Sequence, residues 1–442
     1  MTSRRRQQKQ IIKVEMMKNK KNYGIILALM VCMLFTQTAW AEVHNDEKYT
    51  IKTNETEGWP QGADTYSETA ALMDAETGEI LFDKGKDEAR YPASITKIMT
   101  TLLALEHCSL DEQVTFTESG LARMAEGSNI NMQVGEVLTM EQCLYAVMVR
   151  SANEVAAQVA EHVAGSQEAF AEMMNEKAQE LGCTNTHFNN PSGLPDENHW
   201  TTANDMALIF REALKNEEFV KIIGTLEYTI PPTNLNPEAR TVSSHHAMIV
   251  PSAPEYYEGC IGGKTGVTDL SKNTLVTAAE RDGIRLIAVV MRADPGQVCA
   301  DTKALFDYGF GNFEKLAVQG GELLVPKGVT ENDLTENSVD IEGGEFRTYT
   351  FHDYTVGTVT LSQEELDALE KAEQGGADEP QTVTTKEPTQ ETESAPKEQN
   401  DSVVETYRVI IMVLGVLIAV AILLAIIKAA TRKKKRRKRK KR

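Results

Sequence analysis

The stretch YPASITKIMTTLL, residues 91–103, indicates both how this chain of 442 residues folds and what chemistry it can carry. Apolar residues recur after Pro92 with the spacing of one helical face, which predicts a helix; they are Ile95, Ile98, Met99, Leu102 and Leu103. Ser94 and Lys97 stand three residues apart, and side chains at i and i+3 share one face of a helix. The stretch therefore predicts a hydroxyl beside an amine at a helix N-terminus.

A serine beside a lysine suggests nucleophilic catalysis. A serine hydroxyl needs a neighbouring base to take its proton, and a partly desolvated lysine can act as that base. Free backbone N–H groups at the start of the helix would favour an oxyanion on the attacked carbonyl. Taken alone, however, Ser94 and Lys97 are more typical of an N-cap and a solvated side chain, because about one Ser-x-x-Lys is expected by chance at this length.

Two further motifs follow the first in the chain. Ser-Ala-Asn at 151–153 lies between helical patterns at 140–149 and 154–163, and another helical pattern covers 167–181. Lys-Thr-Gly at 264–266 lies where a strand would border a cleft. The order and context of the three motifs together favour a functional interpretation that none of them supports alone.

These motifs add the groups that an acyl-transfer site needs. Ser151 can relay a proton between lysines, and Asn153 can hold a substrate amide. The cationic Lys264 and the hydroxyl of Thr265 can bind a substrate carboxylate. Gly266 allows the backbone of a substrate to approach closely.

Strand patterns bracket this α-rich middle. Residues 69–73 and 79–82 flank a turn, and residues 274–279 and 284–291 flank Arg281-Asp282-Gly283, so each pair predicts a β-hairpin. We therefore expect an α+β layered domain whose sheet is assembled from both ends of the domain.

The N-terminus carries an export pattern. An apolar core at 25–38 follows three lysines and precedes Ala39-Trp40-Ala41, which predicts a signal peptide over residues 1–41. The alternatives are a retained anchor or a buried helix, but the apolar core is short for a span. The charged stretch before the core is long, so translation can start at Met17 instead of Met1.

The C-terminus carries a membrane pattern. Residues 409–427 hold no charge, and as a helix they would be about 28 Å long, close to a bilayer core of about 30 Å. Every residue over 432–442 is Lys or Arg, and such a tail stays in the cytoplasm. We expect a single-pass protein of the cell membrane, with a transmembrane helix at 405–428, a cytoplasmic tail at 429–442 and the catalytic part outside the cell.

Composition narrows the choice of ligands. Residues 42–427 hold 26 basic and 64 acidic residues, a formal charge of about −38, and this acidic balance does not suit nucleic acid. The cysteines of this region show no C-x-x-C spacing, which predicts neither a disulfide framework nor a zinc site; they are Cys108, Cys143, Cys183, Cys260 and Cys299. No metal and no organic cofactor are expected.

With these motifs the chain resembles the serine-type D-alanyl-D-alanine carboxypeptidases of the low-molecular-mass penicillin-binding proteins. The motifs at 94–97, 151–153 and 264–266 match the Ser-x-x-Lys, Ser-x-Asn and Lys-Thr-Gly signatures, which that family shares with serine β-lactamases. Further family-like sequence lies at 91–94, at 188–194, at 201–203 and at Asp205. The resemblance runs from about residue 67 to about residue 311.

The resemblance implies a penicillin-binding, β-lactamase-like transpeptidase domain at 67–315, in which a helical subdomain packs on an antiparallel sheet. An N-terminal extension at 42–66 would precede it, and a small β-rich domain at 316–369 would follow. Residues 370–404 are rich in Glu, Thr, Pro, Gln and Ser, cannot bury a core, and are expected to form a disordered linker.

By the same resemblance, Ser94 attacks the penultimate D-alanine of a peptidoglycan stem pentapeptide, and water then releases the acyl-enzyme. Lys97 would be the base for acylation, with Ser151 and Lys264 assisting proton transfer to the leaving amine. The oxyanion hole would be the backbone N–H groups of Ser94 and Val267. Penicillins and other β-lactams should acylate the same serine.

Two other functions remain open at this point. A membrane-anchored serine β-lactamase would use the same motifs but would deacylate the antibiotic quickly. A catalytically silent penicillin-binding or wall-binding protein would keep the cleft for recognition only.

Overall fold

The computed structural model of the protein describes residues 48–374. The expected signal peptide, transmembrane helix and basic tail lie outside these residues and stay predictions, as does the linker beyond residue 374. Within the described part of the chain, no helix combines the length and the apolar character that crossing a bilayer requires.

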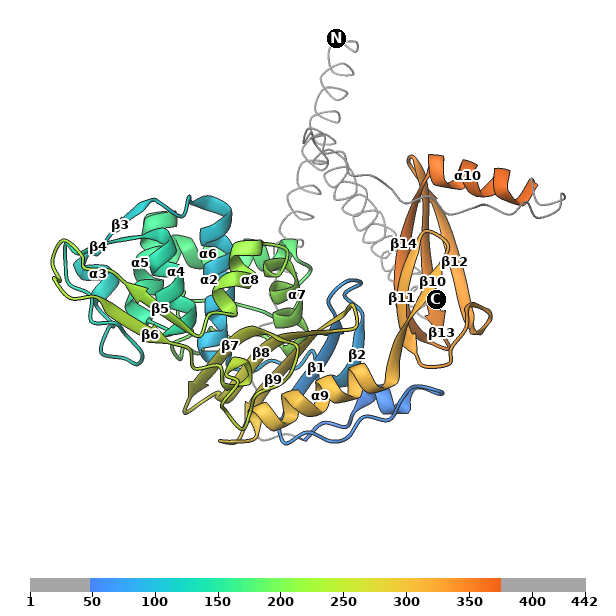
Figure 1. Cartoon of the computed structure of the whole chain (residues 1–442), viewed down its shortest axis with the longest axis horizontal. Helices are drawn as coiled ribbons and strands as arrows, with labels where there is room; N and C mark the ends of the chain where they lie inside the picture. The colour runs from blue at the N-terminus through green and yellow to red at the C-terminus, as the bar shows by residue number, and fades with distance from the viewer. Residues whose placement is uncertain (1–47, 375–442) are drawn as a thin grey trace, which may run out of the picture. The chain divides into compact units, whose positions relative to one another are not determined.

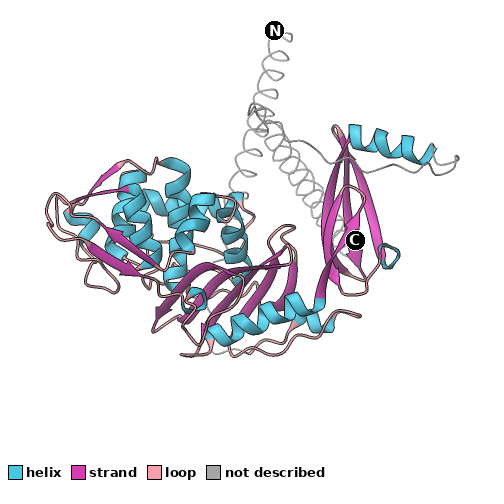
Figure 2. Cartoon of the chain, viewed as in Figure 1, coloured by secondary structure: helices cyan, strands magenta, loops and turns pink. Residues whose placement is uncertain are grey.

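An antiparallel sheet of five strands, in the order β2-β1-β9-β8-β7, is the centre of the larger domain (Figures 1 and 2). The strands are β1 (Thr69–Asp74), β2 (Ile80–Lys84), β7 (Cys260–Thr268), β8 (Lys272–Arg281) and β9 (Ile284–Ala293). β1 pairs with β9, so the two ends of the domain meet in the middle of the sheet. This arrangement confirms the predicted α+β fold with a sheet assembled from both ends.

Both predicted hairpins are confirmed. Between β8 and β9, Asp282 and Gly283 have φ angles of +52° and +74°, the left-handed pair of a type I′ turn, for which Asp-Gly is favoured. Between β1 and β2, the Asp74 carboxylate accepts a hydrogen bond from the Thr77 hydroxyl at 2.6 Å. The backbone N–H of Gly78 donates to the Asp74 carbonyl at 2.9 Å.

The middle of the chain forms a helical layer. Its helices are α2 (Lys97–His107), α3 (Glu118–Leu121), α4 (Met140–Val149), α5 (Asn153–Ala164), α6 (Gln167–Glu180), α7 (Ala203–Ala213) and α8 (Glu217–Ile223). Two short strand pairs accompany them, β3 (Gln113–Thr115) with β4 (Val137–Thr139), and β5 (Glu227–Ile230) with β6 (Arg240–Ser243). The helices predicted at 140–149, 154–163 and 167–181 are confirmed to within one residue.

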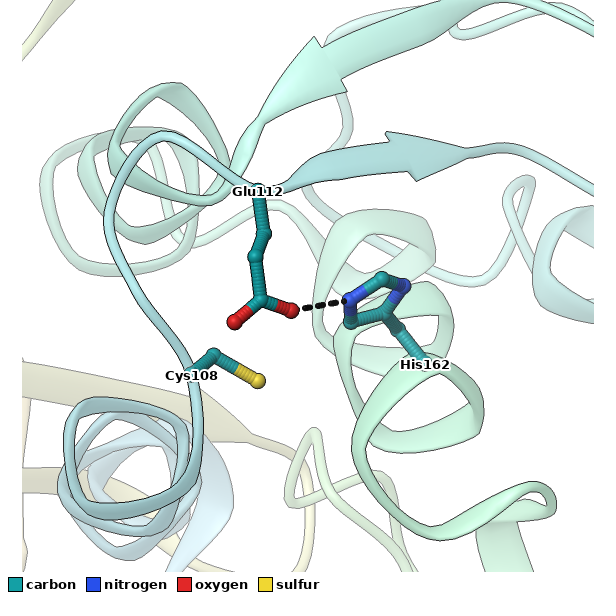
Figure 3. A group of neighbouring side chains, drawn as sticks. All are labelled: Cys108, Glu112 and His162. Atoms are coloured by element: carbon teal, nitrogen blue, oxygen red, sulfur yellow. Dashed lines mark hydrogen bonds and ion pairs between the residues drawn. The ribbon is translucent and has the colours of Figure 1, made fainter.

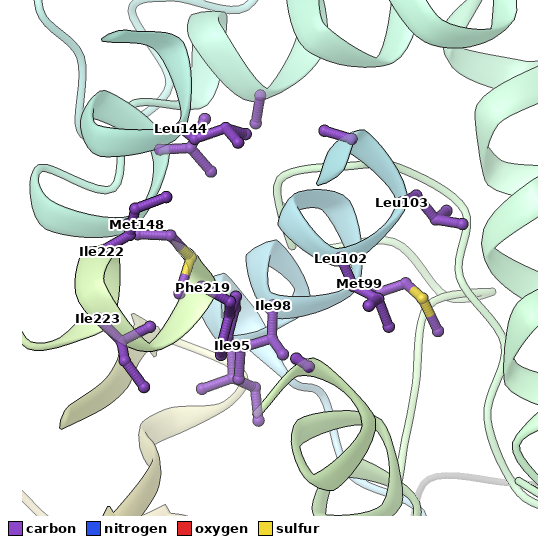
Figure 4. Close-up of a cluster of buried hydrophobic side chains, with 14 of the residues drawn as sticks. Ile95, Ile98, Met99, Leu102, Leu103, Leu144, Met148, Phe219, Ile222 and Ile223 are labelled. Atoms are coloured by element: carbon purple, nitrogen blue, oxygen red, sulfur yellow. The ribbon is translucent and has the colours of Figure 1, made fainter. Parts of the chain in front are cut away.

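Helix α2 lies in the core of this layer, and one part of its prediction is wrong. The first turn, Ala93–Thr96, is a 3₁₀ helix (η2), and the α-helix begins only at Lys97. Every residue from Lys97 to Ala104 is buried, so the helix is enclosed on all sides rather than along one apolar face. Figure 4 shows its apolar side chains among those of α4 and α8, including Leu144 and Phe219.

Both faces of the sheet are covered. Side chains alternate between the two faces along a strand, so successive residues of β1 show which core lies on each face. Ala71 and Met73 of β1 belong to the core shared with the helical layer. Ala70 and Leu72 face a second core, which contains Phe306 of α9 (Val298–Asn312). The sheet is therefore the middle of three layers, which is why most residues of β1, β8 and β9 are buried.

Five strands and a helix follow α9. They are β10 (Phe313–Val318), β11 (Gly321–Pro326), β12 (Leu334–Ile341), β13 (Gly344–Phe351), β14 (Tyr354–Ser362) and α10 (Gln363–Gln374). β10 and β11 form one pair, and β12, β13 and β14 form a three-stranded sheet. The strands β11 to β14 lie within residues 316–369, where the sequence predicts a small β-rich domain.

Helix α10 corrects the expected start of the linker at residue 370, since it continues to Gln374. A capping box starts it: the Ser362 hydroxyl accepts from the backbone N–H of Glu365 at 3.3 Å, and the Glu365 carboxylate accepts from the Ser362 backbone N–H at 2.8 Å. The run that follows consists mostly of good helix formers, so helix propensity outweighs the low apolar content.

Trp59, in the segment before β1, joins the two domains. Its ring lies 5.4 Å from that of Phe313 and 4.4 Å from that of Tyr354. Its indole N–H donates to the carbonyl of Leu81 at 3.0 Å, and the Tyr354 hydroxyl donates to the carbonyl of Ile80 at 2.8 Å. The segment expected only as an extension thus packs between β2 and the β-rich domain.

We predict that Leu102→Ala lowers the free energy of unfolding by about 2–5 kcal/mol, because it leaves a cavity around the enclosed helix α2. Leu235→Ala is the matched control, since Leu235 is 46% exposed and Leu102 only 3%; its effect should stay within about 0.5 kcal/mol. Urea denaturation of both variants measures the difference. Equal losses would contradict a core centred on α2.

Candidate active site

The fold brings the three motifs together. Ser94 lies in η2 and Lys97 at the start of α2, Asn153 begins α5, and Lys264 lies on β7, which packs against η2. The Lys97 Nζ lies 3.0 Å from Ser94 Oγ and donates to Asn153 Oδ1 at 2.7 Å. Its third contact is the backbone carbonyl of Ser192, at 2.6 Å. Residues from three separate segments of the chain thus meet around one amine.

The amine of Lys97 is fully enclosed. Burial is the main cause that lowers the pKa of Lys97 well below its usual value, and the positive charge of Lys264 lowers this pKa further. In its neutral form, the amine has two N–H bonds and one lone pair. Asn153 Oδ1 and the Ser192 carbonyl can only accept, so they take both N–H bonds. The lone pair is left to face the hydroxyl of Ser94, which is the arrangement of a base beside a nucleophile.

Asn153 is held in the orientation that this arrangement needs. Its amide N–H donates to the carbonyl of Glu126 at 3.0 Å, which fixes Oδ1 toward Lys97. Its backbone N–H donates to the carbonyl of Ser128 at 2.8 Å. The expected substrate contact of Asn153 remains a prediction, but the structure assigns the side chain a second task, which is to orient the lysine.

The backbone before Ser94 is strained. Ala93 has a φ of +53°, in the left-handed region that a residue with a Cβ seldom adopts. The Thr274 hydroxyl of β8 donates to the Pro92 carbonyl at 2.8 Å and holds the turn against the sheet. A Cβ on Gly193 would lie 1.8 Å from the Ala93 carbonyl oxygen, so only glycine fits there.

The loop at 189–194 lies within the family-like stretch at 188–194, but the sequence does not show what this loop does in the site. The side-chain oxygen of Asn190 accepts from the backbone N–H groups of Ser192, Gly193 and Leu194, at 3.2, 2.8 and 3.2 Å. This network fixes the Ser192 carbonyl that Lys97 contacts. The local signal was the Asn-Pro-Ser-Gly sequence, which is typical of a turn closed by an asparagine side chain.

His199 is a second residue that the sequence did not single out. Burial lowers its pKa to about 3, so the imidazole is neutral at physiological pH. Its Nδ1 accepts from the backbone N–H of Asn189 at 2.9 Å, so the proton resides on Nε2. Nε2 lies 2.8 Å from the Thr96 hydroxyl and can donate to it, which ties η2 to the 189–194 loop.

The Lys-Thr-Gly motif lies on β7, next to the nucleophile. Lys264 is buried, its Nζ donates to the Thr265 carbonyl at 2.8 Å, and burial lowers its pKa to about 7. A Cβ on Gly266 would lie 2.9 Å from the backbone nitrogen of Ser94, so β7 approaches the nucleophile as closely as backbone allows. Val267 follows on the same strand, and its side chain is exposed.

Among the predicted site residues, Ser151 is the one whose predicted role the structure supports least. It lies in the turn between α4 and α5, is buried, and has a φ of +64°. Among the described residues, its hydroxyl is hydrogen-bonded to neither Lys97 nor Lys264. The proton relay assigned to Ser151 therefore stays a prediction.

A cavity of about 290 Å³ opens beside the amine-centred cluster. Asn153 and Ser192, which contact Lys97, are among its lining residues, as are Arg123 and Glu168.

The fold and the site define a serine peptidase of the Ser-x-x-Lys type, and the comparison with family models agrees. The model of the D-alanyl-D-alanine carboxypeptidases, peptidase family S11, matches residues 53–295. The chain belongs to this family. The match begins within the segment expected as an N-terminal extension and ends after β9.

Individual relatives carry the same name. A D-alanyl-D-alanine carboxypeptidase of Bacillus subtilis (strain 168) is 34% identical over 56% of this chain and 63% of its own length. One from Mycobacterium tuberculosis is 32% identical over 55% of this chain and 82% of its own length. The match thus spans less than two thirds of the first of these relatives. The crystal structure of the Streptomyces K15 DD-transpeptidase is 27% identical with a TM-score of 0.53, over 57% of this chain and 100% of that one.

We predict that Gly193→Ala destabilises the protein more than Gly182→Ala does. Both glycines have a φ of +83°, but a Cβ on Gly182 would meet nothing within 4 Å. Gly182→Ala should cost about 1–2 kcal/mol of backbone strain, and Gly193→Ala about 1–3 kcal/mol more because of the overlap with Ala93. Urea denaturation measures both losses. Equal losses would argue against the close approach at the nucleophile turn.

Proposed function

We propose that the protein is a serine-type D-alanyl-D-alanine carboxypeptidase, which removes the terminal D-alanine from peptidoglycan stem pentapeptides. The observation that carries the proposal is the set of hydrogen bonds of Lys97, which directs the amine at Ser94. Family membership and the names of the relatives supply the substrate class. The activity of the whole chain rests on that inference.

In the proposed acylation step, the Ser94 oxygen bonds to the carbonyl carbon of the penultimate D-alanine while Lys97 takes the hydroxyl proton. Negative charge then develops on the carbonyl oxygen, and the backbone N–H groups of Ser94 and Val267 are the proposed donors to it. The C–N bond breaks, and the leaving D-alanine amine receives a proton through Lys97, with Ser151 and Lys264 assisting. Water repeats the attack on the ester and frees Ser94.

Recognition of the substrate's C-terminus falls to β7 in this proposal. The ammonium of Lys264 and the hydroxyl of Thr265 would bind the terminal carboxylate. Gly266 keeps the strand close enough for the scissile bond to reach Ser94, and Asn153 would contact the substrate amide. β-lactam antibiotics combine a carboxylate with a reactive amide, so they should acylate the same serine.

The proposed cellular setting rests on the sequence. A removed signal peptide and a C-terminal span would place the described domains outside the cell, tethered to the membrane. Such a tether suits a substrate that is itself part of the cell wall. Among the alternatives, a β-lactamase would differ in releasing the penicilloyl group quickly, and a silent binding protein would form no covalent adduct.

The purified full chain should release D-alanine from a pentapeptide ending in L-Lys or diaminopimelate followed by D-Ala-D-Ala. Ser94→Ala should reduce release at least about a thousandfold, because it removes the nucleophile. An enzymatic D-alanine assay measures the rate, and thermal unfolding shows whether the variant is folded. Rapid penicillin hydrolysis without D-alanine release would favour a β-lactamase. Absence of both activities and of any covalent penicillin adduct would favour a recognition protein.

A second prediction concerns pH. Lys264 loses its proton near pH 7 in the free protein, so kcat/KM for a carboxylate-bearing substrate should fall as the pH rises through about 7. Saturating substrate should lessen the fall in kcat, because a bound carboxylate favours the charged lysine. Lys264→Arg keeps its charge, so its normalised kcat/KM profile should lose this fall. An unchanged profile would exclude Lys264 as its source, and Lys221→Arg, on the exposed face of α8, is the control.

A further inference from the structure

Three side chains of different chemical type face one another at a distance from the candidate active site (Figure 3). Cys108 follows α2 directly, Glu112 precedes β3, and His162 lies in the last turn of α5. The Sγ atom, a carboxylate oxygen and a ring nitrogen all lie within 4.8 Å of one another. The Nε2 of His162 is 3.1 Å from Glu112 Oε2. Nothing in the proposed peptidase reaction uses this cluster.

We propose that Cys108, Glu112 and His162 form a binding site for a divalent transition-metal ion, with Zn²⁺ the best match. A thiolate, an imidazole and a carboxylate are the ligand types that Zn²⁺ takes in proteins. With bond lengths of about 2.0–2.3 Å, ligand atoms in a tetrahedral zinc site lie about 3.5 Å apart. The three side chains therefore need to close by about 1 Å. His162 is exposed, so water can take the fourth position.

The loop that carries two of the ligands is already ordered for this task. The second carboxylate oxygen of Glu112, Oε1, accepts from the backbone N–H of Ser109 at 2.7 Å. The backbone N–H of Glu112 donates in turn to the Ser109 carbonyl at 3.1 Å. Outer hydrogen bonds of this kind orient a metal-ligating carboxylate, so Oε2, which faces His162, is the oxygen that would bind the ion. Binding would replace the hydrogen bond between Glu112 and His162 by one bond from each side chain to the ion. The proton on His162 Nε2 would move to Nδ1 by exchange with solvent, and the thiol proton of Cys108 would be released to solvent.

The position in the fold gives the ion a structural role. Helix α2 starts at Lys97 and α5 starts at Asn153, and these two side chains are hydrogen-bonded at 2.7 Å. The cluster lies where the same two helices end, since Cys108 follows α2 and His162 is near the end of α5. Carbonyl groups at helix C-termini favour a positive charge. A bound ion would therefore hold together the far ends of the two helices whose first residues surround Ser94.

Within the part of the chain that the structure describes, no other cysteine belongs to a comparable cluster of metal-binding side chains. All five cysteines of residues 48–374 are free thiols. Within those residues, the cluster at Cys108 is the group of three or more His, Cys, Asp or Glu side chains close enough to share an ion. The sequence could not indicate it, because its ligands at 108, 112 and 162 form no local motif.

The test uses the full chain, freed of metal with a chelator and titrated with Zn²⁺ by calorimetry. Wild type should bind one equivalent in this site, and Cys108→Ser and His162→Gln should each weaken that binding by at least about tenfold. His107→Gln and Cys299→Ser are matched controls that should leave it unchanged, since one alters the neighbouring exposed histidine and the other a half-buried cysteine elsewhere. Thermal unfolding of wild type should shift upward with the Zn²⁺ concentration.

Cobalt gives an independent readout of the ligand set. Co²⁺ in this site should produce the near-ultraviolet charge-transfer absorption of a thiolate ligand, and Cys108→Ser should abolish it. Glu112→Gln, whose amide oxygen can still accept from Ser109, should keep the fold and weaken Zn²⁺ binding. Equal Zn²⁺ affinity in wild type, Cys108→Ser and His162→Gln would overturn the proposal, as would the lack of thiolate absorption in folded wild type.

Discussion

The buried amine of Lys97 is the interaction on which the rest of the structure depends. An amine without water is costly, and it is tolerated here because the oxygen atoms of Ser94 and of two other segments surround it. The two from other segments are held by further hydrogen bonds, Asn153 through Glu126 and Ser192 through Asn190. Loss of any one segment would leave a buried polar group unpaired. The site and the helical layer are therefore stabilised by the same contacts.

The sheet forms the other side of the candidate active site, opposite the helical layer. β7 approaches the nucleophile turn so closely that Gly266 has no room for a Cβ, and the hydroxyl of Thr274 binds the carbonyl before Ala93. A left-handed alanine is unfavourable by itself, and it persists because the sheet on one side and Gly193 on the other leave no alternative. Strain at the nucleophile is thus balanced by packing on both sides of it.

Much of this could be predicted from the sequence, and the rest could not for definite reasons. Helical spacing and the motif residues identified Ser94 and Lys97 as neighbours, and Asp-Gly located a hairpin. The contact with Ser192 could not be predicted, because it is made by a backbone carbonyl, which every residue carries. The role of His199 could not be predicted, because a single histidine forms no spaced motif. The start of α2 was misplaced because the 3₁₀ turn runs directly into the helix, and the spacing of apolar residues does not distinguish the two over four residues. The expected start of the linker at residue 370 was too early, because the composition of the segment was given more weight than the capping box at Ser362 that starts α10.

The pairing of β1 with β9 has a consequence for how the chain reaches this state. The two strands are more than 200 residues apart, so β1 has no partner on that side until β9 has been synthesised. Contacts this distant in sequence slow folding, because the intervening loop must close first. Until then the inner edge of the β1–β2 hairpin is open to wrong partners. Under the export proposed for this protein, the chain would cross the membrane unfolded from its N-terminus onward, and its sheet could not be completed before most of the domain had passed.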